Sequence, residues 1–155
     1  MFYALLKTLH LLAIIVWVGG MFFSHFILRP ALADLEPPQR LKLLHAVLGR
    51  FFAAVAVASL TALITGLWMV GRVAKQTVQS GGSFQMSFDW WLMAVLGVLM
   101  VAIFGHIRFV LFRRFSLAVQ AQTWPAAAQV ANSLRQWVAI NLGLGLLIVV
   151  VVLLV

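Results

Sequence analysis

The sequence predicts an all-α integral membrane protein built as a bundle of four transmembrane helices. Of its 155 residues, 65% are hydrophobic and only 9% are charged, whereas an ordinary soluble domain has about 25% charged residues. The apolar residues fall in runs of about 20, long enough to cross a hydrocarbon core about 30 Å thick. These observations exclude a soluble globular domain and a disordered chain. The chain contains no cysteine, which excludes a disulfide scaffold and thiolate metal ligands.

Four windows qualify as spans: residues 8–28, 50–71, 90–107 and 136–155. In lipid each backbone N–H must find its partner within the segment, so these runs are expected to be helices although they are rich in Val and Ile. We expect residues 1–155 to form a single four-helix domain. An even number of spans places both termini on one side of the membrane.

The charges predict the orientation. The net charge of +8 is interpreted as a topology signal and not as a nucleic-acid surface, because the Lys and Arg residues lie where the apolar runs stop. The loop 29–42 carries Arg29, Arg40 and Lys42 against Asp34 and Glu36, and the loop 108–135 carries four arginines and no acid. The basic residues of the loop 72–89 are only Arg72 and Lys75. We therefore expect the first and third loops to be cytoplasmic and both termini periplasmic. The segment 117–136 is expected to extend the third and fourth helices beyond the bilayer, with a break at Pro125.

All four histidines lie in or beside a span: His10, His25, His45 and His106. Ionisable side chains are costly inside a membrane, so each is a candidate functional residue. From their places in the spans, His25, His45 and His106 should lie near the cytoplasmic face. At 1.5 Å of rise per residue, His10 lies about 22 Å from His25 and enters the first span from the other side. The depth estimate therefore favours His45 with His106 as a pair of ligands.

Three of these histidines, all except His25, also belong to a face that we expect to point inward. These faces are His10, Ile14, Trp17, Met21, Ser24 and Leu28 in the first span, His45, Gly49, Phe52, Ala56, Ser59, Leu63 and Gly66 in the second, and Val95, Leu99, Ala102, His106 and Phe109 in the third. The small residues of the second face indicate either close helix packing or space for a flat macrocycle, with His45 as axial ligand and Gly49 relieving contact. Arg50 and Arg108 are either signals that fix the orientation of the helices in the membrane or partners for the propionates of a bound haem.

A different set gathers toward the other side: His10, Met69 and Met93, with Met1 and Met86 nearby in sequence. Thioether and imidazole ligands suit Cu(I), although methionine is also ordinary apolar filler. Asn141 in the fourth span is expected to form a hydrogen bond across helices. No hydrolase motif or carboxylate pair is found, and no catalytic residue is assigned. If the chain is an enzyme, a haem-dependent membrane oxidoreductase is the expected class, because a cofactor would supply the missing chemistry.

Several short motifs carry a resemblance to known families. The first span contains Leu6-Lys7-Thr8-Leu9-His10 followed by Trp17, Gly20 and Phe22. The third ends in Gly105-His106, with Arg108 and Arg113-Arg114 after it, and the fourth opens with Leu134-Arg135 before Asn141. This pattern resembles the CopD-type copper-resistance membrane domain and the related HemJ-type protoporphyrinogen oxidase, both small four-helix membrane proteins. The HemJ resemblance implies b-type haem held by His10 and His106. The CopD resemblance implies copper handling across the bacterial inner membrane, again with His10.

Three hypotheses follow. The leading one is a haem b protein of the bacterial inner membrane acting in electron transfer or redox chemistry. The alternative is a copper-binding or copper-transport protein, and the third is a structural membrane subunit. The predicted cofactor site comprises His10, His45, His106, Arg50, Arg108 and Gly49, and the predicted metal ligands are His10, His45, His106, Met69 and Met93. The expected surroundings are the lipid bilayer and, for a redox protein, a donor or acceptor protein or a quinone. Gly143 and Gly145 are compatible with a homodimer, and nucleic acid is not an expected partner.

Overall fold

The protein folds into four long helices that run side by side, as the sequence predicts. The structure is a computed structural model and describes residues 1–154. The first rod consists of α1 (Phe2–Phe22), the π-helical η1 (Phe23–Leu28) and α2 (Arg29–Ala31), and the second is α3 (Pro37–Gln79). The third consists of α4 (Phe88–His106), the π-helical η2 (Ile107–Leu111) and α5 (Phe112–Gln120), and the fourth is α6 (Trp124–Leu154). All four are long and apolar enough to cross a membrane.

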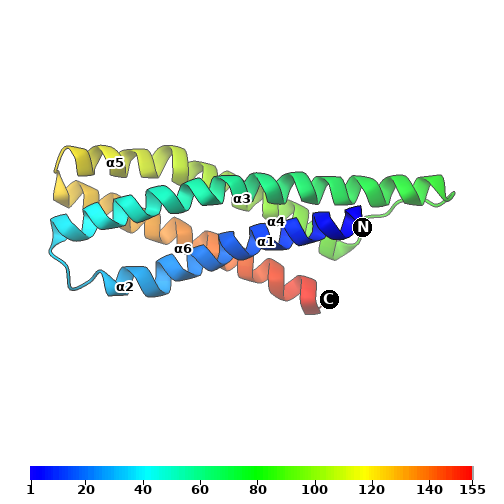
Figure 1. The fold of residues 1–155 in the computed structure, drawn as a ribbon, viewed down its shortest axis with the longest axis horizontal. Helices are drawn as coiled ribbons and strands as arrows, with labels where there is room; N and C mark the ends of the chain where they lie inside the picture. The colour runs from blue at the N-terminus through cyan, green and yellow to red at the C-terminus, as the bar shows by residue number, and fades with distance from the viewer. Residues whose placement is uncertain (155) are drawn as a thin grey trace.

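The rods alternate in direction, so both chain ends lie toward the same end of the bundle (Figure 1). The opposite end carries the two tight connections, residues 32–36 and 121–123. α1 packs mainly on α3, and α4 packs mainly on α6. α1 and α4 are therefore diagonal to each other in the bundle, although the Trp17 and Phe104 rings meet edge to face in the centre, 6.1 Å apart.

The helices are longer than the apolar windows because the windows record only the part that lipid surrounds. α3 has 43 residues, about 65 Å at 1.5 Å per residue, which is twice the hydrocarbon thickness. It begins at Pro37 and Pro38, where a missing N–H costs no helical hydrogen bond. It ends before Gly81, whose φ of 81° is a left-handed conformation that glycine adopts without strain. The helix break near residue 125 lies slightly earlier than expected, at residues 121–123, and Pro125 falls in the first turn of α6.

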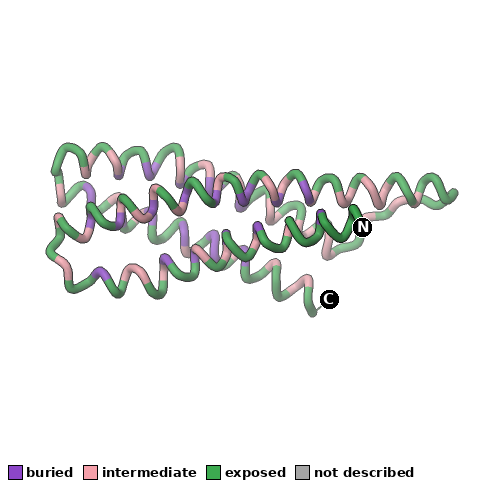
Figure 2. The backbone as a smooth tube through the Cα atoms, viewed as in Figure 1, coloured by how far each residue is buried: buried purple, intermediate pink, exposed green. Residues whose placement is uncertain are grey.

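The buried residues are concentrated where all four rods overlap, and the far end of α3 is largely exposed (Figure 2). The core contains aromatic rings from three rods, including Trp17, Phe52, Phe104, Phe112 and Phe115. In the first rod the predicted inward face is largely confirmed, since Trp17 and Met21 of α1 and Ser24 of η1 are buried. In α3 the buried stripe lies beside the predicted one and shares only two of its residues, Phe52 and Ser59.

For the third rod the predicted inward face is wrong. All five of its residues, from Val95 to Phe109, are exposed, and the buried positions are instead Met100, Ile103, Phe104, Ile107 and Leu111. A helix that is apolar on every side gives no periodic signal for the face it buries. Asn141 is buried as expected, with 1% of its surface exposed. Its Oδ1 nevertheless has no hydrogen-bond partner within residues 1–154, so the expected bond across helices is not found at that atom.

Candidate functional site

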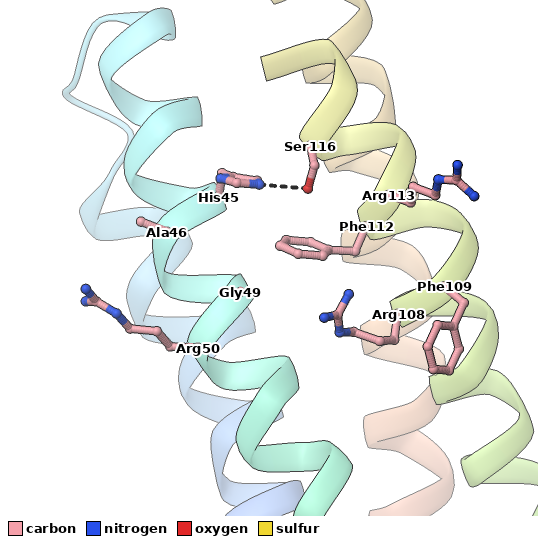
Figure 3. A pocket seen from close by; sticks show the side chains of 9 residues that line it. All are labelled: His45, Ala46, Gly49, Arg50, Arg108, Phe109, Phe112, Arg113 and Ser116. Carbon is pink, nitrogen blue, oxygen red and sulfur yellow. Dashed lines mark hydrogen bonds between the residues drawn. The ribbon is translucent and has the colours of Figure 1, made fainter. Parts of the chain in front are cut away.

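One pocket of about 550 Å³ opens between α3 and the η2–α5 segment. It is lined by His45, Ala46, Gly49, Arg50, Arg108, Phe109, Phe112, Arg113 and Ser116. Four of the predicted cofactor residues, His45, Gly49, Arg50 and Arg108, therefore border a single space. Figure 3 shows Arg108 and Phe112 directed into the gap toward α3, while Arg50 and Arg113 extend outward on either side.

The ring of Phe112 organises this pocket. The His45 imidazole stacks on it, with centroids 5.2 Å apart and an angle of 8° between the planes. The Arg108 guanidinium carbon lies 5.3 Å from the centre of the same ring, within the range of a cation–π interaction. His45 Nε2 is also 2.7 Å from the Ser116 hydroxyl (Figure 3). Two basic groups are thus held in place by one aromatic side chain.

His10 occupies a separate site between α1 and α3. Its Nδ1 lies 3.0 Å from the carbonyl oxygen of Ala62 and 3.0 Å from Oγ1 of Thr65. A carbonyl oxygen only accepts hydrogen bonds, so Nδ1 carries the proton and donates it. In the neutral ring the lone pair then lies on Nε2. Histidines that bind metals are commonly oriented in this way, by an N–H donated to a backbone carbonyl.

Small residues of α3 allow this close approach. A Cβ atom built on Gly66 would lie 3.4 Å from His10 Cε1, so the backbone of α3 lies directly against the imidazole. Met69 follows Thr65 by four residues and is therefore on the same side of α3, one turn further along. Met93 lies on α4, which is diagonal to α1 in the bundle. His10 and Met69 are thus on adjacent helices, whereas Met93 comes from across the bundle.

The structure does not pair His106 with either of the other predicted ligands. His106 is exposed and its ring lies 5.2 Å from that of Trp137 on α6. Ser116, the partner of His45, is ten residues beyond His106, about 15 Å of helical rise. Thr65, the partner of His10, is twenty residues beyond His45, about 30 Å. Within residues 1–154 no three His, Cys, Asp or Glu side chains are grouped so that they could hold a metal ion.

A further basic cluster lies at the end of the first rod. His25 is in η1, Arg29 follows it in α2, and Arg135 of α6 is near enough to interact electrostatically with both. His25 Nδ1 and Arg29 Nη2 are buried and have no hydrogen-bond partner in the part of the chain that the structure describes. Arg29, Arg50, Arg108 and Arg135 therefore all lie at the same end of the bundle, where the apolar windows stop.

The sequence did not single out the residues that organise the two sites. Phe112 and Ser116 lie beyond the third apolar window, and Thr65 lies inside the second. One signal for the first two is the amphipathic pattern of α5, in which Phe112 and Phe115 are buried and Arg113 and Arg114 are exposed. Nothing in the sequence identifies Thr65, because its contact with His10 joins residues 55 positions apart.

The fold and these polar sites define a multi-pass membrane protein with four spanning helices. The family model of copper resistance protein D (CopD) matches residues 45–155. The chain therefore belongs to the CopD family, as the sequence motifs indicated. The match begins at His45, so α1 and His10 lie outside the matched residues. Comparisons with curated proteins and with solved structures gave no significant match.

Proposed function

We propose that this protein handles copper as its cargo, binding Cu(I) within the membrane and serving copper resistance or copper transport. Membership of the copper resistance protein D family supports the choice of metal. Imidazole and thioether groups are suitable ligands for Cu(I) in a chain without cysteine. The proposal agrees with the alternative drawn from the sequence rather than with the leading haem hypothesis.

One structural observation carries the assignment of a ligand: the fixed orientation of His10. Its Nδ1–H is donated to the Ala62 carbonyl, and no hydrogen bond to its Nε2 is found among the described residues. The ring lies between α1 and α3, and Met69 follows Thr65 by one helical turn along α3. We assign His10 as the principal copper ligand and Met69 as its neighbour.

The arginines at one end of the bundle support an orientation for this protein. Lys and Arg at the ends of spans are retained on the cytoplasmic side, so this end is proposed to be cytoplasmic and both termini periplasmic. The copper ligand His10 would then lie in the periplasmic half of the first helix. A bacterial inner membrane is the location that fits this arrangement.

Haem b is supported less well. The pocket beside His45 has arginines that would suit the propionates, and its volume of about 550 Å³ is within the range of ligand-binding pockets in proteins. However, it contains one imidazole, because His106 lies on the exposed face against Trp137. The residues present therefore do not fit a haem with two histidine ligands.

A Cu(I) titration of the detergent-purified protein against a chromogenic Cu(I) chelator tests the proposal. We expect His10→Ala to lower the affinity for Cu(I) strongly. His106→Ala removes one imidazole as well, but from the exposed face, and is expected to bind copper like the unsubstituted protein. Circular dichroism and gel filtration of both variants show whether they are folded. Equal copper binding by the His10→Ala variant and the unsubstituted protein would refute the assignment.

A further inference from the structure

We propose that the pocket between α3 and η2–α5 binds the phosphate headgroup of an anionic phospholipid. This site is distinct from the copper site, because His45 is about 30 Å of helical rise from the level of His10. The charge, the position and the shape of the pocket each support the proposal.

The positive charge of the pocket favours the binding of an anion. Arg50, Arg108 and Arg113 line it, and no Asp or Glu is among its nine lining residues. Arg108 is half-buried and rests on the Phe112 ring, and its guanidinium is held in the gap with no carboxylate partner among the described side chains. Arginine binds phosphate oxygens through two parallel hydrogen bonds, which makes it the usual residue for this task.

Polar donors complete the site. The Ser116 hydroxyl and the His45 imidazole are hydrogen-bonded to each other at one end of the pocket. Either group has a hydrogen to offer an anion when the pair rearranges. Arg50 and Arg113 are exposed and directed outward on the two sides (Figure 3), and a long arginine side chain at such a position can turn toward a bound phosphate.

The position of the pocket at the edge of the hydrocarbon favours a lipid headgroup as the bound anion. Arg50 begins the second apolar window and Arg108 follows the third directly, so the pocket lies at the boundary between hydrocarbon and water. Basic pockets between transmembrane helices at the cytoplasmic face are typical binding sites for anionic lipid headgroups. This end of the bundle is the one that the positive charges assign to that face.

The shape of the pocket suits an amphiphile. Ala46 and Gly49 form its wall on α3, and Phe109, which is 73% exposed, continues the apolar surface toward the membrane. An acyl chain can therefore lie against Phe109 while the headgroup enters between the helices. A Cβ atom at Gly49 would be in van der Waals contact with the Phe112 ring, at 3.4 Å, so a side chain much larger than a methyl group would fill the entrance.

The experiment measures lipid retention in nanodiscs or micelles by native mass spectrometry, with phosphatidylglycerol and phosphatidylcholine offered in equal amounts. We expect the unsubstituted protein to retain phosphatidylglycerol selectively. Arg108→Gln should weaken this binding about tenfold, the usual effect of removing a charge-assisted hydrogen bond. Arg114→Gln is the matched control, because it removes the same charge from an exposed position on α5 that does not line the pocket.

A second variant keeps every charge. Gly49→Leu is expected to fill the entrance beside Phe112 and to abolish selective retention, while both variants keep the copper affinity of the unsubstituted protein. Equal losses for Arg108→Gln and Arg114→Gln would overturn the proposal, because lipid would then respond only to net charge. Displacement by millimolar inorganic phosphate would also overturn it, in favour of a free anion. A Soret band that disappears in Arg108→Gln would do so in favour of haem propionates.

Discussion

Replacing Phe112 by alanine tests which face of the third rod is packed in the bundle. Phe112 is 7% exposed, and its ring meets those of Phe52 and His45 at 5.3 Å and 5.2 Å. Truncating a buried phenylalanine to alanine costs about 3–5 kcal/mol in protein cores. Lipid is as apolar as the side chain, so lost packing rather than transfer from water supplies most of the effect. We therefore expect a loss of about 3 kcal/mol in the free energy of unfolding.

The matched control is Phe109→Ala, one turn away. Phe109 is 73% exposed, so its truncation is expected to change the free energy of unfolding by no more than about 0.5 kcal/mol. Unfolding in mixed micelles by increasing SDS, followed by tryptophan fluorescence, measures both variants. Equal losses, or a larger loss for Phe109→Ala, would refute the packing described for this rod.

Three further predictions concern single contacts. Thr65→Val removes one acceptor of the His10 N–H and is expected to lower the affinity for Cu(I) about 10–100-fold in a chelator competition. Its control is Thr61→Val, which removes only a hydroxyl bound within α3 and should leave the affinity for Cu(I) unchanged. Asn141→Leu replaces an unsatisfied buried oxygen and is expected to leave the SDS unfolding midpoint unchanged or raised; a clear fall would show that the oxygen is bonded. In Gly20→Leu the new side chain would overlap the Phe51 ring on α3. The free energy of unfolding is expected to fall by about 1–3 kcal/mol in the same assay, and an unchanged midpoint would contradict that contact.

The number of helices and their approximate positions could be predicted from the sequence, because a bilayer requires apolar runs of a fixed length. The extension of the third and fourth helices past the bilayer was also predicted, but the two extensions of α3 were not, since they carry charges that the hydropathy windows exclude. The inward face of the first rod was predicted well. The face of the third was not, because Leu99 and Met100 are equally suited to lipid and to the core.

The pocket was partly foreseeable. Depth along the helices placed His45, Gly49, Arg50 and Arg108 near one face of the membrane, and the structure brings them to one pocket. It does not bring His106 there, because that side chain projects from α4 toward Trp137. Helical depth gives the height of a residue but not its direction around the helix axis, and the π-helical segment η2 changes that direction further.

The identity of the cargo is tested most directly by the copper content and the visible spectrum of one sample of the purified protein. The protein is loaded with Cu(I) after expression with sufficient haem and is then freed of unbound metal. The proposed function predicts retained copper, lost in the His10→Ala variant, and no Soret band. A Soret band in a sample that retains no copper would contradict it.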